Sequence, residues 1–364
     1  MESPLADVGS PQQRPLDIVR APLEDVLRPF LRDAARTLSD MDEALAPVAG
    51  AAMELVLSGG KRLRPAFVYW GCVAAGGEPG DAVLRAAGAV ELLHAFALVH
   101  DDVMDRSDER RGRPAVHRAM GAWHAEQGLR GDADWFGVGA AILAGDMLFV
   151  WADELFDQAV QGLADARGAR AVFTDLRVEV MAGQYLDLRL AGLRAPSREQ
   201  VLRVALLKSG RYTVTRPLLL GAAVSEAPRD PALEAALHAY GDAVGVAFQL
   251  RDDVLGLFGD PAVTGKGAIG DLREGKRTLL VLRALELAGE SGRAAIEAGL
   301  GDAELDEAAA ERIRDVVRTS GALDAVERDV QERLAEAHEA LRPLPEPARG
   351  ALERLALDAA RRGA

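Results

Sequence analysis

The stretch "LLHAFALVHDDVMD" at residues 92–105 is an apolar run that ends in a cluster of three aspartates. If it forms an α-helix, with 100° between successive residues, His94, Ala97 and Asp105 lie within about 40° of Asp101. One helix face then presents an imidazole, a small side chain and two carboxylates roughly 6 Å apart along the axis. Carboxylates beside an apolar run need a neutralising partner, and this spacing suits a hard cation such as Mg²⁺.

A second acid pair occurs in "FQLRDDVLGLFGD" at residues 248–260. Here Asp252 and Asp253 end another mostly apolar run, and Gly256 stands where the first cluster has its third aspartate. One such pair alone is better explained as a solvated helix end. Two pairs on helices that face each other could hold several metal ions in one cavity.

The basic residues are distributed unusually, because only four of the 43 are lysines. A chain so rich in arginine can retain lysine where a compact ammonium is needed and a planar guanidinium would not fit. Arginine suits bidentate phosphate recognition, so carboxylates for a metal together with dispersed basic residues indicate a diphosphate site. The basic residues in question are Lys61, Arg62, Arg64, Arg110, Arg111, Lys208, Lys266 and Lys276.

Composition favours one large helical domain. The 364 residues are 49% hydrophobic and only 5% aromatic, and Ala, Leu, Glu and Arg dominate. No Gly/Ser-rich linker divides the chain. We therefore expect an all-α fold, a single antiparallel helical bundle around a central cavity, over residues 21–364, preceded by a disordered lead at residues 1–20.

Helical patterns cover most of the chain, and no convincing strand alternation is present. Two segments are expected to be loops: residues 106–114, which are densely charged, and residues 119–136, which resemble a surface excursion. The expected helices are 22–44, 47–58, 63–76, 80–105, 138–163, 167–190, 198–225, 231–257, 276–288, 303–319, 322–342 and 347–361.

Several classes of protein are excluded. The net charge of −14 argues against nucleic acid as a partner. Histidine and cysteine spacings match no zinc motif, and no phosphate-binding glycine loop is present. No continuous apolar run reaches the ~18 residues of a membrane span. A single cysteine, Cys72, and an acidic N-terminus without a signal peptide favour a cytoplasmic protein.

The chain resembles the trans-isoprenyl diphosphate synthase (polyprenyl synthetase) family, and within it the geranylgeranyl diphosphate synthases of actinobacterial type. The resemblance spans about two-thirds of the chain in the order typical of the family. It is carried by the motifs "GGKRLRP" (59–65), "LLHAFALVHDDVMDRSDERRGRPAVH" (92–117), "GQYLDL" (183–188), "KSGRYT" (208–213) and "FQLRDDVLGLFGDPAVTGK" (248–266).

The resemblance implies a role for each matching residue. Asp101 and Asp105, with Asp102 in support, and Asp252 on the opposite wall would bind three Mg²⁺ ions. Two polar residues, Ser209 and Gln249, would face the allylic cation. The allylic diphosphate would be held by Arg110, Lys208, Lys266 and Lys276, and isopentenyl diphosphate by Lys61, Arg64, His94 and Arg111.

The implied reaction is the Mg²⁺-dependent, head-to-tail condensation of isopentenyl diphosphate with an allylic diphosphate, catalysed by a homodimer. Phe96 and Ala97, which lie five and four residues before Asp101, resemble the pair found in producers of geranylgeranyl diphosphate (C20). Farnesyl diphosphate (C15) is the alternative product. Because Asp252 is central on its face, we expect Asp252→Ala to be far more damaging than Gly256→Asp.

Two other functions remain open at this point. A terpene cyclase would ionise a single prenyl diphosphate and would not need the second basic pocket that "GGKRLRP" and "RRGRP" provide. A non-catalytic helical subunit would be expected to lose acidic or lysine residues, whereas the first acid cluster is intact here.

Overall fold

The computed structural model describes residues 14–193, 195–259 and 269–360, and helices dominate throughout, which confirms the all-α prediction. The α-helices are α1 (Pro15–Met41), α2 (Ala46–Leu57), α3 (Leu63–Ala74), α4 (Asp81–Met104), α5 (Val116–Glu126), α6 (Ala133–Val160), α7 (Ala166–Ala191), α8 (Arg198–Val204), α9 (Arg216–Ala223), α10 (Pro231–Phe258), α12 (Gly270–Arg273), α13 (Leu279–Leu287), α14 (Glu290–Gly299), α15 (Glu307–Thr319), α16 (Ala322–Ala340) and α17 (Ala348–Ala360). A 3₁₀-helix, η1 (Glu43–Leu45), and a π-helix, η2 (Ala205–Thr215), complete the set.

Side chains cap several of these helices where the sequence begins a new element. The carboxylates of Asp132, Asp230 and Asp306 accept hydrogen bonds from the first turns of α6, α10 and α15. Ser197 and Gln200 form a reciprocal capping box on α8. Such caps satisfy backbone N–H groups that have no partner within the helix, and they fix where each helix begins.

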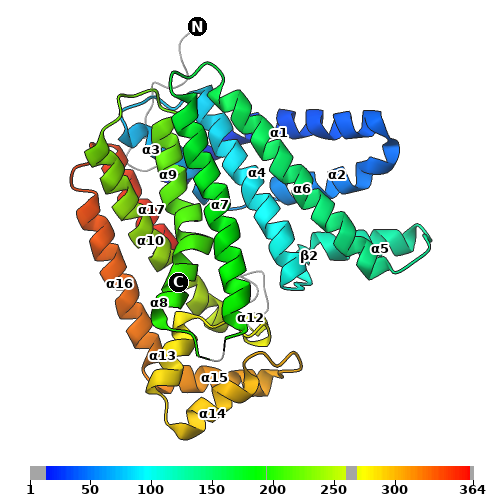
Figure 1. The fold of residues 1–364 in the computed structure, drawn as a ribbon, viewed down its shortest axis with the longest axis vertical. Coiled ribbons are helices and arrows are strands. Elements are labelled where there is room, and N and C mark those ends of the chain that lie inside the picture. The colour runs from blue at the N-terminus through cyan, green and yellow to red at the C-terminus, as the bar shows by residue number, and fades with distance from the viewer. Residues whose placement is uncertain (1–13, 194, 260–268, 361–364) are drawn as a thin grey trace.

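The helix α4 is a central core helix that packs against α6 on one side and α3 on the other. In Figure 1, α4, α6, α7, α9 and α10 run along the length of the molecule, while α14 and α15 lie across its lower end. The π-helix η2 packs on both α7 and α10. This arrangement places α4 and α10, which carry the two acid pairs, around the same interior space.

Two groups of buried apolar side chains support the bundle. The larger one includes Phe67, Leu92, Leu148 and Tyr240 from α3, α4, α6 and α10. The smaller one gathers α13, α15 and α16 around the C-terminal half of α10. Because α10 contributes to both groups, the acid pair near its C-terminal end is held by packing from both.

The structure corrects four details of the sequence prediction. The helix α1 begins at Pro15, so the expected helix start at residue 22 is too late. Residues 119–136 are not a loop, because α5 covers their start and α6 begins at Ala133. The helix α14 was not expected. Strands β1 (Glu109–Arg110) and β2 (Arg113–Pro114) form a short antiparallel hairpin where none was predicted.

Two helices, α4 and α6, are long and apolar enough to cross a membrane by length and composition. No continuous apolar run marks these two helices in the sequence, because scattered polar residues interrupt the apolar stretch of each helix. In α4, 67% of the most apolar window is buried inside the protein, as expected of a core helix. In α6 only 39% is buried, so part of its apolar surface faces outward.

Candidate active site

A large cavity of about 1790 Å³ lies between α4, α7, η2 and α10. Most of the residues singled out in the sequence converge on it from separate parts of the chain. The predicted site residues that line it are Lys61, Arg64, His94, Ala97, Asp101, Asp105, Arg110, Arg111, Lys208, Ser209, Gln249, Asp252 and Lys276.

The first acidic wall is the C-terminal end of α4. Asp101 accepts a hydrogen bond from Gln184 Nε2 at 3.0 Å and lies 3.4 Å from Lys208 Nζ. Asp105 follows the last helical residue and lies 3.3 Å from Lys276 Nζ. Both carboxylates face the cavity, as the helical spacing predicts.

Asp102 is placed differently from its two neighbours. Its carboxylate is 2% exposed and does not line the cavity. Arg110, carried on the β1–β2 hairpin, donates to both Asp102 oxygens in a forked ion pair. Burial by itself lowers the pKa of Arg110, but the hydrogen bond to Asp102 and the neighbouring aspartate charges together outweigh this effect and raise the pKa. Asp102 therefore does not face the cavity. It holds Arg110 beside Asp101, so that Arg110 Nη2 lies 3.6 Å from Asp101 Oδ2.

The second acidic wall is the C-terminal end of α10, where the adjacent aspartates have different surroundings. Asp252 is exposed to the cavity. Asp253 accepts a hydrogen bond of 2.7 Å from Gln249 Nε2. Burial, together with the neighbouring charges of Asp252 and Asp271, raises the pKa of Asp253 well above its ordinary value. Both aspartates line the cavity, and Asp252 is the more exposed carboxylate of the pair.

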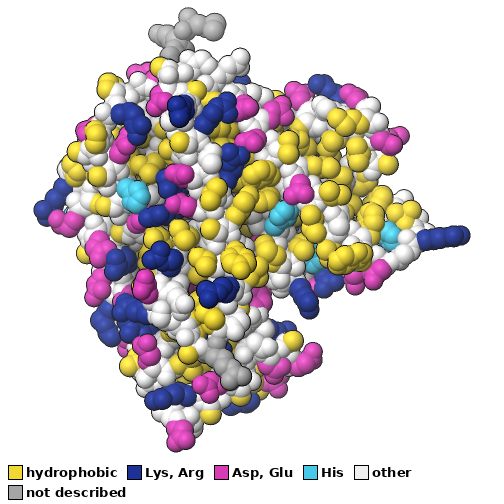
Figure 2. All heavy atoms as spheres, viewed as in Figure 1, with side chains coloured by type: hydrophobic (Ala, Val, Ile, Leu, Met, Phe, Trp, Pro, Cys, Tyr) yellow, Lys and Arg dark blue, Asp and Glu magenta, His cyan; other side chains and the backbone are white. Residues whose placement is uncertain are grey.

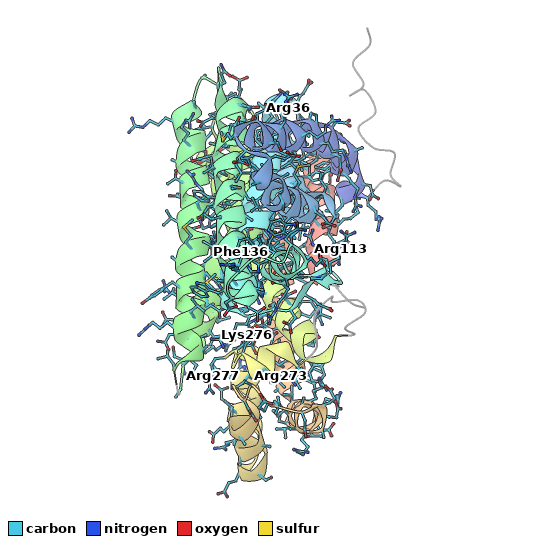
Figure 3. All side chains as sticks on the ribbon, turned by 90° about the vertical axis from the view of Figure 1, so that its right-hand side faces the viewer. Arg36, Arg113, Phe136, Arg273, Lys276 and Arg277 are labelled. Carbon is cyan, nitrogen blue, oxygen red and sulfur yellow. The ribbon has the colours of Figure 1, made fainter. Side chains whose placement is uncertain are left out.

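Gly256 leaves space that a side chain from another element fills. A Cβ atom at position 256 would lie 2.0 Å from Oδ2 of Asp271, the second residue of α12. The other oxygen of Asp271 accepts a hydrogen bond of 3.0 Å from Lys276, which also contacts Asp105. Figure 3 shows Lys276 beside Arg273 and Arg277 near α12. The Asp271 carboxylate of α12 therefore occupies the space that an aspartate in place of Gly256 on α10 would need.

We expect Gly256→Asp to lower kcat about tenfold, because the new side chain must displace the Asp271 carboxylate from Lys276. The cost stays moderate since the displaced atom is the end of a side chain. The measurement is kcat as a function of Mg²⁺ concentration. Gly139→Ala, which places a Cβ in open space, is the control. A double variant, Gly256→Asp with Asp271→Gly, should recover activity; an unimproved double variant would contradict this reading of the pair.

Lys208 and Ser209 are presented by the π-helix η2, which the sequence does not reveal. Backbones approach closely on both sides of it. A Cβ at Gly183 of α7 would lie 2.3 Å from the Lys208 backbone nitrogen, and one at Gly245 of α10 would lie 2.4 Å from Gly210. Lys208 Nζ donates to Asp187 at 2.6 Å. Burial alone lowers the pKa of Lys208, but the charges of Asp101 and Asp187 outweigh it and raise it.

A basic pocket lies on the other side of the cavity. The Arg64 guanidinium stacks over the Tyr212 ring at 4.4 Å, and its buried Nε has no hydrogen-bond partner among the described residues. The Tyr212 hydroxyl also meets His94 Nδ1 at 3.1 Å. Arg111 donates to the carbonyl of Gly59, at the turn before α3. This cluster of basic side chains, in which the Arg64 Nε is an unused donor, suits a phosphate group.

Besides Asp102, two predicted residues are not part of the cavity as described. Lys266 lies outside the described residues. Phe96 is 9% exposed and packs toward α6, with ring centroids 4.7 Å from His100 and 5.0 Å from Phe149. Its neighbour Ala97 does line the cavity. Phe96 therefore lies behind the cavity wall and not in it.

The cavity residues that sequence reasoning missed include Gln184, Asp187, Tyr212, Asp271 and Arg277. The first three fall in the stretches "GQYLDL" and "KSGRYT", which were noted without assigning roles to these positions. Asp271 and Arg277 flank Lys276 in sequence, and that proximity was the available signal.

The carboxylates fit Mg²⁺ bound together with a diphosphate. Among the described residues, no three His, Cys, Asp or Glu side chains converge as a ready-made cage. Mg²⁺ is commonly held by one or two carboxylates, with water and substrate phosphate completing its octahedron. Asp101, Asp105 and Asp252 present carboxylate oxygens to one cavity, which matches this requirement.

The chain is similar to known proteins over most of its length. Residues 46–317 match the model of the polyprenyl synthetase family. The geranylfarnesyl diphosphate synthase of Aeropyrum pernix is 34% identical over 284 residues, 77% of this chain and 82% of its own. The geranylgeranyl diphosphate synthase of Mycobacterium tuberculosis is 34% identical over 335 residues, 90% of each chain.

The fold also matches a solved structure over nearly the whole chain. This is the geranylgeranyl pyrophosphate synthase of Corynebacterium glutamicum, crystallised with isoprenyl diphosphate and magnesium. It superposes with a TM-score of 0.88 at 37% identity, covering 96% of this chain and 98% of the other.

Proposed function

The chain belongs to the polyprenyl synthetase family of head-to-tail prenyltransferases, and from this premise we propose that it makes geranylgeranyl diphosphate (C20). One observation carries the proposal: two acidic walls and a separate basic pocket face the same cavity. The acidic walls suit a metal-bound allylic diphosphate, and the basic pocket suits a second diphosphate without metal.

Each wall has a distinct task in this proposal. Asp101 and Asp105 at the C-terminal end of α4, with Asp252 on α10, would hold three Mg²⁺ ions, which would neutralise charge on the diphosphate. Lys208 and Lys276 bind its oxygens between the walls, and Arg110 and Lys266 contribute further positive charge. Isopentenyl diphosphate is held by Lys61, Arg64, His94 and Arg111.

The reaction proceeds by ionisation, condensation and elimination. The allylic C–O bond breaks, and both electrons leave with the diphosphate that the cationic side chains stabilise. Oxygen atoms of Ser209 and Gln249 face the resulting allylic cation. The double bond of isopentenyl diphosphate attacks this cation, and the released diphosphate accepts the proton that is then lost. The protein contributes mainly position and charge.

The direct test is incubation with Mg²⁺, isopentenyl diphosphate and each allylic starter (C5, C10 and C15), followed by measurement of product chain length. We expect C20 as the main product. A C15 product would identify a farnesyl diphosphate synthase. Cyclic hydrocarbon without consumption of isopentenyl diphosphate would overturn the proposal in favour of a cyclase, and inactivity of the purified protein would favour a non-catalytic subunit.

Product length is proposed to depend on Phe96, behind the small Ala97. We expect Phe96→Ala to give products longer than C20, because removing the ring opens space toward Phe149. Ala97→Phe should shorten them. The measurement is chain-length analysis of the products. Phe156→Ala is the control, since this buried ring stacks on Phe173 and does not line the cavity. An unchanged product from Phe96→Ala would refute the role of Phe96.

We also propose a homodimer, joined through α6 and α7. Large apolar side chains are exposed along both helices, and Figure 2 shows them as a broad hydrophobic area across the middle of the molecule. An exposed apolar area of this kind favours association. The side chains are Ile142, Leu143, Val150, Val178, Met181 and Tyr185.

We expect Val150→Asp combined with Val178→Asp to convert the dimer to a monomer at micromolar concentration, because each charge would have to be buried in the interface. Sedimentation velocity measures the mass. Leu287→Asp, on α13, is the control, since Leu287 is comparably exposed at 51%. A double variant that sediments like the unmodified protein would place the interface elsewhere.

The proposed location is the cytoplasm. Cys72, the single cysteine, is buried, and burial raises the pKa of its thiol to about 12. A thiol of this kind is inert and suits a reducing compartment. The proposed partners are isopentenyl diphosphate and allylic prenyl diphosphates, not nucleic acid.

A further inference from the structure

Arg62 is a buried arginine at the turn between α2 and α3. It precedes the first residue of α3 in a left-handed backbone conformation, with φ +52°. Its side chain is only 1% exposed. Arg62 lies at the margin of the cavity, between Lys61 and Arg64 in sequence, and all three residues line it. The sequence motif "GGKRLRP" singled out this arginine, but the proposed function gives it no role.

The Arg62 guanidinium binds three helices at once. Nη1 donates to Glu91 Oε1 of α4 at 2.5 Å. Nη2 donates to Glu24 Oε1 of α1 at 3.2 Å and to the carbonyl of Val56 in α2 at 2.8 Å. Five fixed donors on a planar group allow this, whereas a lysine ammonium cannot reach three partners in these directions.

The same turn is held from its other side by Arg111. This side chain donates to the carbonyls of Leu55, at 3.4 Å, and Gly59. A Cβ at Gly60 would lie 3.1 Å from its Nη2, so the turn and the guanidinium are closely packed. The C-terminal carbonyls of α2 are thus satisfied by two cations, which also complement the negative end of the helix.

Glu91 is the second important member of this cluster. It is 4% exposed and lies one helical turn before His94 on α4. Burial lowers the pKa of Arg111, and the charge of Glu91 opposes this larger effect in part. A buried carboxylate at this position would repel a diphosphate, and the ion pair with Arg62 neutralises it.

We propose that Arg62, Glu91 and Glu24 form a positioning cluster that fixes Lys61, Arg64 and His94 for the metal-free diphosphate. The proposal rests on the proposed function of that pocket and deepens it. The cluster supplies no ligand atom. It couples the turn that carries Lys61 and Arg64 to the helix that carries His94, so the basic groups keep the spacing that one diphosphate requires.

The variants Arg62→Lys and Glu91→Gln test this proposal. Arg62→Lys keeps a cation but loses the planar group that binds both glutamates. Glu91→Gln keeps a polar side chain but removes the charge that pairs with Arg62. We expect the KM for isopentenyl diphosphate to rise about tenfold, while the KM for the allylic diphosphate changes less than about twofold. Calorimetric titration with isopentenyl diphosphate in the absence of Mg²⁺ should show a similar loss of affinity.

The control is Arg314→Lys, because Arg314 is a 7% exposed side chain outside the cavity that also binds two glutamates and a backbone carbonyl. It should leave the ratio of the two KM values unchanged. If Arg62→Lys fails to fold, Glu91→Gln and Glu24→Gln carry the test. Equal rises in both KM values, or unchanged affinity in both variants, would overturn the proposal. Failure of the unmodified protein to bind or consume isopentenyl diphosphate would instead refute the proposed function.

Discussion

Asp252→Ala is expected to lower kcat about a thousandfold, or about 4 kcal/mol in the activation free energy. Asp252 is the exposed carboxylate of the α10 wall, and its loss leaves the diphosphate charge stabilised from the α4 wall alone. The effect should exceed that of Gly256→Asp by about two orders of magnitude. Steady-state kinetics with saturating Mg²⁺ and both substrates measures it.

The adjacent aspartate offers a matched control. Asp253 accepts from Gln249, and Asp253→Asn keeps an oxygen for that hydrogen bond. We expect a fall in kcat of less than about tenfold for this variant. Equal losses for Asp252→Ala and Asp253→Asn would show that the two carboxylates share the metal, and the distinction drawn from their surroundings would be wrong.

Lys208→Met is expected to lower kcat/KM for the allylic diphosphate by about 10²- to 10³-fold. Its ammonium lies between Asp101 and Asp187, which would otherwise repel both each other and the departing diphosphate. The KM for isopentenyl diphosphate should change far less, because that pocket is formed by other residues. Varying each substrate in turn at saturation of the other measures both effects.

Arg211→Met provides the control for Lys208. Arg211 lies on the same π-helix but pairs with Asp242 and Glu179 outside the cavity. Its replacement should change kcat/KM by less than about threefold, because partly exposed ion pairs contribute little. A loss of less than tenfold in Lys208→Met would contradict the proposed role of its charge.

Much of the site can be predicted from sequence because its signals are local. A 3.6-residue period places Asp101 and Asp105 on one face of α4, and the structure shows both in the cavity. The scarcity of lysine likewise points to Lys61, Lys208 and Lys276, which line the same space. Helix periodicity and residue chemistry need no knowledge of tertiary contacts.

Other features depend on contacts between distant segments. Nothing near Asp102 in the sequence shows that Arg110 will bind it and turn it away from the cavity. The space at Gly256 has meaning only beside Asp271, which comes from another helix. A hairpin with two residues in each strand is too short to show strand alternation, so β1 and β2 could not be recognised.

The π-helix η2 makes the site sensitive to the length of the chain as well as to its composition. Hydrogen bonds from i to i+5 accommodate an additional residue that an α-helix would not hold. Deleting one residue between 209 and 215 would permit ordinary helical bonding and leave the helix continuous. It would also rotate Lys208 relative to Arg216 by about 100°. Insertions and deletions here should therefore be eliminated by selection even where substitutions of the neighbouring side chains are tolerated.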